Sequence, residues 1–358
     1  MKIAFYISNP LNDGGAERVV TNLANTFVSK GYSVTVITPY RANIEYQVDD
    51  RVCRYYIDEE VYSNRITRPV SRIFRLRRYL KIHKIKVLFA FLDGAVNYSV
   101  LATRFSDVRV IVSERNDPRQ YFKTIIQKLW IRTIYDMADA AVFQTPDAKK
   151  WFNKSIQQRS KIIYNPVRDE FYDNEHNPIE NRVITCGRLD RQKNHHMLID
   201  AMVQVVKKYP MLKLSVFGIG QLKGDLDAYI REKRLEDNII LEGNCQDIPS
   251  VLKTAEFFVL SSDFEGAPNA LMEAMAMGVP SISTDCPCGG PKMLLGNNEN
   301  GLLVPVGDSK AMADAICKLH KDKLLQNKYS ERGKIFAERF RMANIFSEWE
   351  SIIDMALK

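Results

Sequence analysis

Short runs rich in β-branched and aromatic residues alternate with longer helical segments along almost the whole chain. This alternation is typical of α/β proteins, in which helices cover both faces of a parallel sheet. In the first half the β-rich runs are Ile3–Ile7, Ser33–Ile37, Val87–Phe91, Val108–Val112, Ala140–Phe143 and Lys161–Tyr164. In the second half they are Arg182–Thr185, Lys213–Phe217, Ile239–Leu241, Phe257–Leu260 and Ser281–Ile282. The pattern predicts one doubly wound unit followed by another.

The length of 358 residues favours two domains, because it exceeds what one ordinary core accommodates. Between the two halves lies Asn165–Asn181, whose two prolines and polar residues are typical of a linker. We therefore expect an N-terminal domain over 1–167 and a C-terminal domain over 168–342. Residues 343–358 have helical spacing with no following strand, and we expect this helix to pack back on the N-terminal domain.

The compartment is indicated by what the chain lacks. The first residues, MKIAFYIS, have no long apolar core of the signal-peptide kind, and no stretch approaches 18 consecutive apolar residues. We therefore expect a cytoplasmic protein. Cys286 and Cys288 have one residue between them, whereas zinc sites need two or more, so we expect reduced thiols and no metal site.

The net charge of +8 is concentrated in one segment, since Val61–Leu92 contains no Asp or Glu. Its cations are Arg65, Arg68, Arg72, Arg75, Arg77, Arg78, Lys81, Lys84 and Lys86. Apolar residues lie between them near helical spacing, which predicts an amphipathic basic helix. We expect Arg68, Arg72, Arg75, Arg78 and Lys81 to face anionic lipid headgroups, with a solvated helix face as the alternative. Nucleic acid is not expected, because the segment has no interleaved glycines, RNP-like run or zinc-finger spacing.

Ligands in open α/β sheets bind beyond the carboxyl ends of the strands, so the loops that follow strands are the places to search. After the first strand, Asn9–Arg18 contains Gly14 and Gly15, which permit a tight turn and a close approach to the N-terminus of a helix. After the first strand of the second half, Arg188 and Lys193 flank a short loop. A guanidinium fork with a lysine charge is suited to a diphosphate.

The third loop, within Ser261–Pro280, carries the strongest pattern. Glu265 lies in the loop after a strand, and Glu273 lies on the helix predicted from about Asn269 to Met277. The amides of Asn269, Ala270 and Leu271 then form an anion site at the start of this helix. Glu265 is placed to accept sugar hydroxyls and Glu273 to accept ribose hydroxyls, although a lone glutamate at such a position is ordinarily an exposed helix charge.

Together these motifs resemble the family 4 glycosyltransferases, which have the GT-B fold. The resemblance rests on GGAER after the first strand, GRLDRQKN, EGAPNALMEAMAMGVP with its Glu-x7-Glu spacing, and NGLLVPVGD at Asn300–Asp308. They span nearly the whole chain in the family's order. Among family members, the chain is most similar to bacterial enzymes that extend lipid-linked oligosaccharides, including N-acetylgalactosaminyltransferases and galactosyltransferases.

The resemblance implies two Rossmann-like domains facing across a cleft and a retaining, metal-independent transfer from a UDP- or GDP-sugar. It also implies no cofactor, an acceptor that is a membrane-associated, polyprenyl-diphosphate-linked glycan, and an enzyme that is peripheral on the inner face of the cytoplasmic membrane.

The resemblance also implies roles for individual residues. Arg188 and Lys193 bind the donor diphosphate, while Glu273 holds the ribose. Glu265 and the amides of Gly266 and 269–271 position the sugar and the distal phosphate, and Gly15 completes the site from the other domain. Where the family often has a histidine that touches the donor sugar, this chain has Arg115, followed by Asn116; both are candidates for sugar or acceptor contact.

Other functions stay open at this point. Gly218-Ile219-Gly220 with Gly224 is near the dinucleotide fingerprint of an NAD-dependent oxidoreductase, but the third glycine is one place late. Asp225 and Asp227 match the metal-binding Asp-x-Asp pattern, but they lie on a predicted surface helix. A soluble acceptor and a non-catalytic nucleotide-sugar-binding subunit are the remaining alternatives. The identity of the sugar, the linkage position and the oligomeric state are not readable from the sequence.

Overall fold

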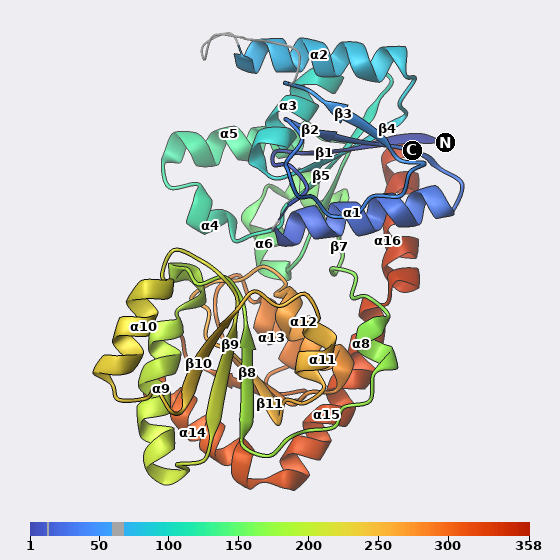
Figure 1. The fold of residues 1–358 in the computed structure, drawn as a ribbon. Helices are drawn as coiled ribbons and strands as arrows, with labels where there is room; N and C mark the ends of the chain where they lie inside the picture. Colours follow the sequence, from blue (N-terminus) through green and yellow to red (C-terminus); the bar gives the residue numbers. More distant parts are fainter. Residues whose placement is uncertain (13, 59–67) are drawn as a thin grey trace. The chain divides into compact units, whose positions relative to one another are not determined.

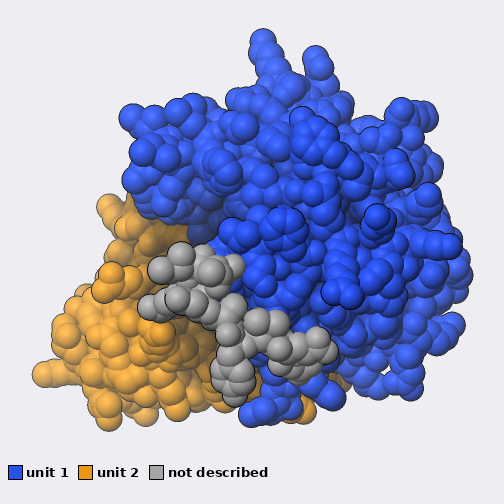
Figure 2. Space-filling view, turned by 90° about the horizontal axis from the view of Figure 1, so that it is seen from above, with its two compact units in different colours: residues 1–166, 342–358 blue, residues 167–341 orange. Residues whose placement is uncertain are grey.

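The computed structural model describes residues 1–12, 14–58 and 68–358. The chain divides into two compact units, which Figure 2 colours separately: unit 1 comprises Met1–Pro166 with Met342–Lys358, and unit 2 comprises Val167–Arg341. Each division lies one residue before the boundary expected from the sequence. Within the described residues, no helix is long and apolar enough to cross a bilayer.

Unit 1 is built on a parallel sheet with the strand order β3-β2-β1-β4-β5-β6-β7 (Figure 1). Its strands are β1 Lys2–Ile7, β2 Ser33–Thr38, β3 Cys53–Tyr56, β4 Val87–Phe91, β5 Arg109–Ser113, β6 Ala140–Phe143 and β7 Ser160–Ile162. The sequence analysis missed β3, whose residues at the sheet edge are half-buried or exposed and therefore lack a strong apolar signal.

The helices of unit 1 cover both faces of this sheet. Alternate residues of β1 point to opposite faces, so Phe5 joins a core with α1 Gly15–Ser29 and α16 Met342–Leu357, while Tyr6 joins a core with α2 Arg68–Ile82 and α3 Asp93–Thr103. On this second face α5 Ile125–Asp136 packs against α3. The shorter helices are α4 Pro118–Tyr121, α6 Pro146–Trp151 and α7 Lys154–Gln158.

The C-terminal helix α16 belongs to unit 1 although it follows the whole of unit 2 in the chain. Trp349 is fully buried, and its ring lies 5.7 Å from that of Phe91 and 5.4 Å from that of Phe89. Burial of so large an apolar side chain stabilises the packing of α16 against the unit 1 sheet.

Unit 2 repeats the architecture with the strand order β10-β9-β8-β11-β12-β13. Its strands are β8 Arg182–Cys186, β9 Lys213–Phe217, β10 Ile239–Gly243, β11 Phe257–Leu260, β12 Ser281–Thr284 and β13 Leu302–Val304, of which the sequence analysis missed the last. Its helices are α8 Glu170–Asp173, α9 His195–Lys208, α10 Lys223–Glu232, α11 Ile248–Leu252, α12 Asn269–Met277, α13 Gly290–Leu295, α14 Ser309–Lys321 and α15 Lys323–Ala337. The prediction of two doubly wound α/β domains is confirmed.

Each sheet reverses its strand order at one place, between β1 and β4 in unit 1 and between β8 and β11 in unit 2. Loops leave such a point in opposite directions and open a crevice beyond the carboxyl ends of the strands. The loops after β1, β8 and β11, which the sequence analysis selected for their chemistry, all start at these points.

Candidate functional site

In unit 2 the loops after β8 and β11 are held together by side chains from both. Gln192 Nε2 donates to the carbonyl of Phe264 at 2.9 Å, and Asn194 Nδ2 donates to Asp263 Oδ1 at 2.7 Å. Ser261 Oγ donates to the carbonyl of Lys193 at 2.8 Å. These bonds are independent of any ligand, so the residues of the two loops are arranged before a substrate arrives.

Lys193 and Glu265 face each other across this junction. Lys193 Nζ lies 2.5 Å from Glu265 Oε1, and the same oxygen accepts a bond of 2.7 Å from the hydroxyl of Ser262. The side chains of Lys193 and Glu265 are 15% and 8% exposed. A half-buried cation and a buried carboxylate therefore lie side by side at the carboxyl end of the unit 2 sheet, where an ammonium suits an anion and a carboxylate suits hydroxyl groups.

The backbone of Glu265 is held by the loop that follows β12. Its N–H donates to the carbonyl of Pro287 at 2.8 Å, and its carbonyl accepts from the N–H of Cys288 at 3.3 Å. A Cβ at Gly290 would lie 1.6 Å from the carbonyl oxygen of Gly266, so only glycine permits this close approach. Three loops thus position Glu265, although the sequence analysis recognised only two of them.

Arg188 differs from Lys193 in its exposure. Its side chain is 65% exposed, with Asp190 Oδ2 at 3.2 Å and Gln192 Oε1 at 3.3 Å from the guanidinium. Behind it, the buried His195 ring lies 3.2 Å from the Arg188 carbonyl, and burial lowers the pKa of His195 to about 4. A neutral imidazole therefore supports the backbone of the loop, while the guanidinium remains accessible.

The helix α12 begins at Asn269, and its N-cap residue Pro268 makes no side-chain capping hydrogen bond. The first N–H groups of a helix have no carbonyl partner within it and carry a partial positive charge, so the start of α12 is suited to an anion. Glu273 lies one turn further on and is 7% exposed. Burial first and the charge of Glu273 second raise the pKa of the Cys186 thiol, which places Glu273 near the carboxyl end of β8. Glu273 is therefore not an exposed helix charge, and its role at the ribose stays a prediction.

The unit 2 candidates Arg188, Lys193, Glu265, Gly266, 269–271 and Glu273 therefore all lie on loops and a helix start at one sheet edge. The glycine-rich loop after β9 supports them from beside β8. A Cβ at Gly220 would lie 2.3 Å from the carbonyl oxygen of Leu189, and Leu189 N–H donates to the Ile219 carbonyl at 2.9 Å. Close backbone packing accounts for Gly218 and Gly220, since a Cβ at Gly218 would lie 1.9 Å from the carbonyl oxygen of Gly187.

In unit 1, Gly14 precedes α1 and lies against the carboxylate of Glu17, since a Cβ on Gly14 would be 1.7 Å from Glu17 Oε2. Asn9 Nδ2 donates to Glu17 Oε1 at 2.8 Å. Glu17 is 5% exposed and was not singled out from the sequence. An internal carboxylate therefore lies at the start of α1, where Gly14 and Gly15 were expected to present amides to a ligand.

Arg115 is buried rather than projecting from its loop. Its guanidinium donates to Asn165 Oδ1 and lies 5.5 Å from the centre of the Phe91 ring, and burial lowers its pKa to about 10. The neighbouring Asn116 is half-buried, and its N–H donates to Glu114 Oε1 at 3.0 Å. The contacts described for Arg115 thus lie within unit 1.

Glu114 is a titratable group that the sequence analysis missed. Burial, together with the charge of Asp93, raises its pKa to about 8. Its carboxylate accepts from the N–H groups of Arg115 and Asn116 and lies 3.4 Å from the hydroxyl of Tyr135. A carboxyl group at the end of β5 gave no sequence signal, because only the fold shows that it is fully enclosed.

The basic segment forms α2, but its charge is partly compensated. Asp58 lies just before the segment that contains no Asp or Glu. Its carboxylate forms ion pairs with Arg68, Arg72 and Arg75, with Arg68 Nη2 at 2.7 Å and Arg75 Nη2 at 3.4 Å. These three cations therefore have a counter-charge in unit 1, which the sequence analysis missed because it counted neighbours in sequence and not in space. Arg78 and Lys81 are exposed, and Arg65 lies outside the described residues.

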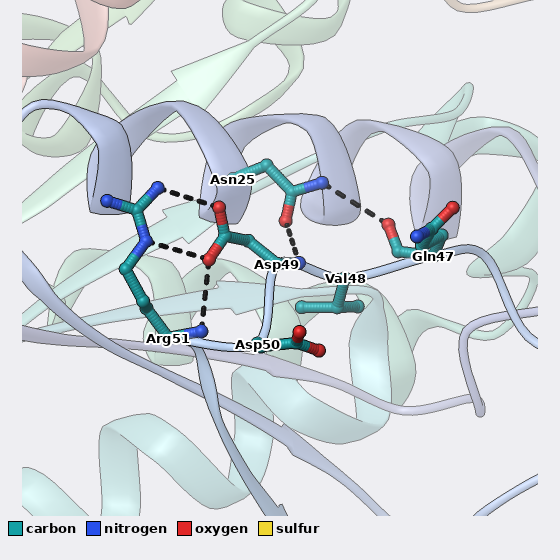
Figure 3. A pocket seen from close by; sticks show the side chains of 6 residues that line it. All are labelled: Asn25, Gln47, Val48, Asp49, Asp50 and Arg51. Carbon is teal, nitrogen blue, oxygen red and sulfur yellow. Dashed lines mark hydrogen bonds and ion pairs between the residues drawn. The ribbon is translucent and has the colours of Figure 1, made fainter.

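One shallow pocket lies away from the candidate site residues, and another lies beside the Glu265 loop. One, of about 590 Å³, lies between α1 and residues 47–51 (Figure 3). Asn25 there bonds to the Gln47 carbonyl and the Asp49 N–H, and Arg51 pairs with Asp49, so its polar groups tie this segment to α1. The other, of about 650 Å³, is beside the Glu265 loop and is lined by Asp263, Asp285, Pro287, Asn297, Asn298 and 303–306.

Among the described residues, no group of three or more His, Cys, Asp or Glu side chains is arranged to hold a metal ion. Asp225 of the Asp-x-Asp pattern lies on α10, where its carboxylate is 2.8 Å from His196 Nε2.

Comparison with known proteins agrees with this arrangement. Residues 13–171 match the model described as Glycosyltransferase Family 4, and residues 167–336 match that of Glycosyl transferases group 1. Two curated relatives come from Campylobacter jejuni. One is GalNAc-α-(1→4)-GalNAc-α-(1→3)-diNAcBac-PP-undecaprenol α-1,4-N-acetyl-D-galactosaminyltransferase, 26% identical over 99% of this chain and 98% of its own length. The other is N-acetylgalactosamine-N,N'-diacetylbacillosaminyl-diphospho-undecaprenol 4-α-N-acetylgalactosaminyltransferase, 27% identical over 96% and 97%.

Solved structures show the same fold. Anabaena Alr3699/HepE in complex with UDP has a TM-score of 0.83 at 17% identity, covering 99% of this chain and all of its own. The lipopolysaccharide outer core galactosyltransferase WaaB has a TM-score of 0.77 at 20% identity, covering 99% of each chain. With both halves matched in order and two Rossmann-like sheets of the expected topology, this chain is a glycosyltransferase and belongs to family 4 of the GT-B fold.

Proposed function

We propose that this glycosyltransferase transfers a hexose or N-acetylhexosamine from a UDP-sugar, with retention of configuration, to a polyprenyl-diphosphate-linked glycan. The observation that carries the proposal is the grouping of Lys193, Glu265 and the start of α12 at the switch point of unit 2. A cation and helix-end amides suit a diphosphate, and an adjacent carboxylate suits sugar hydroxyls. The Campylobacter relatives, whose names specify undecaprenol-linked substrates, support the lipid-linked acceptor.

The donor's phosphates are assigned to Arg188, Lys193 and the amides of 269–271. Glu273, buried near the end of β8, is assigned to the ribose, and Glu265 with Gly266 to the sugar. Arg188 is exposed and moves to the ligand at little cost, whereas Lys193 is already held in place by its contact with Glu265. When the donor binds, the Lys193 ammonium therefore has to share its hydrogen bonds between Glu265 and a phosphate oxygen.

In the proposed reaction the bond between the anomeric carbon and the diphosphate oxygen breaks. The acceptor oxygen bonds to the same face of the sugar, and its proton passes to the departing phosphate. No protein nucleophile is required, so the protein contributes by positioning both substrates and by stabilising the charge on the leaving diphosphate. Arg188 and Lys193 supply that stabilisation, and we expect turnover to persist in EDTA.

Unit 1 is assigned to the acceptor, with Asn116 as the remaining candidate there, while Gly14 and Gly15 stay assigned to the donor diphosphate. Arg115 is assigned a supporting role, because its guanidinium is buried against Asn165 and Phe91. The exposed cations Arg78 and Lys81 of α2 are assigned to an anionic membrane surface, which would hold the enzyme at the inner face of the cytoplasmic membrane.

The test is release of UDP or GDP from a panel of nucleotide sugars, with and without a polyprenyl-diphosphate-linked glycan. We expect release from a UDP-sugar that depends on the acceptor, and an axial anomeric linkage in the product by NMR when the donor is an α-linked UDP-hexose. Tight UDP binding without transfer from any donor would instead indicate a non-catalytic binding subunit. Binding of NAD in preference to UDP would contradict the whole assignment.

A further inference from the structure

The N-terminal end of α5 presents large apolar side chains to solvent. Ile125 and Ile126 are 75% and 80% exposed, and Leu129 and Trp130 are 61% and 52% exposed. The opposite side of the helix, with Ile131, Ile134 and Tyr135, is buried in unit 1. The exposed apolar residues are therefore not part of the buried core of unit 1. They form a second apolar face on a helix whose other apolar face is already buried.

This end of α5 is held firmly. A capping box starts the helix, with Gln127 N–H donating to Thr124 Oγ1 at 3.2 Å and Thr124 N–H donating to Gln127 Oε1 at 3.1 Å. Trp130 Nε1 donates to Asn97 Oδ1 on α3 at 2.7 Å, which fixes the edge of the indole and leaves its ring half in solvent. Clustered apolar side chains held outward on an ordered helix mark an interaction surface.

The charges around this end indicate the kind of partner. From Pro118 to Tyr135 the chain has no Asp or Glu but has four cations. Arg119 pairs with Asp117, and the guanidinium of Arg132 lies 4.4 Å from the centre of the Trp151 ring. Lys123 is exposed beside the apolar residues, and Lys128 is half-buried next to them. Exposed apolar side chains flanked by lysines, in a segment without carboxylates, are complementary to the boundary between anionic headgroups and acyl chains.

The α2 helix, which packs on α3 as α5 does, also exposes apolar and basic side chains. On the sheet face that α5 shares with α3 and α2, the α2 residues Val70 and Phe74 are 56% and 65% exposed, and Arg78 and Lys81 are exposed on the same helix. In Figure 1 these helices lie on the side of the unit 1 sheet opposite to α1 and α16.

We propose that the first two turns of α5 insert into an anionic lipid bilayer, with Ile125, Ile126, Leu129 and Trp130 in contact with acyl chains and Lys123 near lipid phosphates. The inference rests on the proposed lipid-linked acceptor, because an enzyme with such an acceptor meets a bilayer at every turnover. It differs from attraction to the cations of α2 alone, since contact of apolar side chains with acyl chains is not screened by salt.

The test uses the full chain with vesicles of phosphatidylcholine containing about one-third phosphatidylglycerol. The variant Ile125→Gln/Ile126→Gln keeps good helix formers at exposed positions, so its folding is preserved. A matched control is Leu324→Gln/Ile335→Gln, at positions 83% and 74% exposed on α15 of unit 2. We expect the α5 variant to bind vesicles at least about tenfold more weakly, and the control to bind as the unaltered chain does.

Trp130 supplies a local readout. Vesicles with brominated acyl chains should quench its fluorescence. In a Trp151→Phe background, Trp130→Phe should remove most of that quenching, because the one remaining tryptophan, Trp349, is fully buried. Equal vesicle binding by the α5 variant and the control would overturn the proposal. So would a change in oligomeric state caused by the α5 variant without vesicles, because it would identify this face as a contact between copies.

Activity measurements distinguish this inference from the proposed function on which it rests. On a water-soluble, short-chain analogue of the acceptor, we expect the α5 variant to keep its turnover, while on acceptor embedded in vesicles its turnover falls. If no acceptor is glycosylated by the unaltered chain, the proposed function fails, whereas the vesicle-binding result still stands or falls by itself.

Discussion

Lys193 Nζ lies 2.5 Å from Glu265 Oε1, although the two residues are 72 positions apart in the chain. The contact joins the loops after β8 and β11, the strands on either side of the switch point in unit 2. In the absence of a donor these two charges neutralise each other. Under the proposed function, each would exchange part of that interaction for a substrate group, so that neither charge is left buried and unpaired.

Replacing Lys193 by alanine should lower turnover about a hundredfold or more, because the charge developing on the leaving diphosphate loses a buried cation. The measurement is kcat/KM for UDP release by the purified variant, with its fold checked by circular dichroism. The neighbouring Arg191 is exposed, and Arg191→Ala is the matched control. Near-normal turnover of Lys193→Ala would remove Lys193 from the proposed role.

Glu273→Gln should weaken UDP binding by roughly tenfold to a hundredfold, because a neutral amide replaces a charged acceptor of ribose hydroxyls. Isothermal titration with UDP and with uracil measures the effect. The loss should appear with UDP and not with the base alone. Glu232→Gln, on the exposed surface of α10, should bind UDP unchanged. An unaltered UDP affinity in Glu273→Gln would contradict the ribose assignment.

Asn194 is placed to test the preorganised loops. It adopts a left-handed backbone conformation with φ 44°, accepts from the Met197 N–H at the start of α9 and donates to Asp263. Asn194→Asp keeps the acceptor for Met197 and tolerates the backbone, but it places a carboxylate against Asp263. We expect about 1–2 kcal/mol lower stability and a several-fold rise in donor KM. A thermal midpoint and donor KM equal to those of the unaltered chain would show that the tie between the loops is dispensable.

Asp58 should contribute to stability in a pH-dependent way. Burial raises its pKa, but bonds from Arg72 and Arg68 outweigh this and bring the pKa below its ordinary value of 3.8. A lowered carboxyl pKa in the folded state means that the stabilisation is present above this ordinary value and is lost as the pH falls through the folded value. Denaturation by urea at pH 7 and at pH 3 measures it.

The matched variant is Asp58→Asn. At pH 7 it should lower the free energy of unfolding by about 2 kcal/mol, because Arg72 and Arg75 are less than one-fifth exposed and lose their counter-charge. At pH 3 the difference should shrink. A difference that is equal at both pH values would show that the charge of Asp58 is not the source of the stabilisation.

Much of the fold was predictable because its signals are local. The buried strands around Phe5 and Phe258 are continuous apolar runs, and Gly31, with φ 86°, directly follows the end of the first helix, where glycine is the usual residue. The edge strand β3 and the short β13 were missed because partial exposure removes the apolar pattern on which such predictions depend.

The candidate site was also accessible in part. Lys193, Glu265 and Glu273 could be found because loops after neighbouring parallel strands meet at one edge of a sheet. Three features could not be predicted: the burial of Glu17, the burial of Glu114, and the hydrogen bond from the Glu265 N–H to the Pro287 carbonyl. Each depends on a contact that no local sequence pattern encodes.

The sequence by itself determined the alternation of strands and helices and the residue types in the loops after them, because backbone propensity, apolar periodicity and motif spacing are properties of short segments. The tertiary structure alone decided which charges are compensated and which apolar side chains remain outside. Asp58 neutralises arginines of α2, while Ile125 and Ile126 stay in solvent, because burial and ion pairing depend on distances in space between residues that the chain order does not place together.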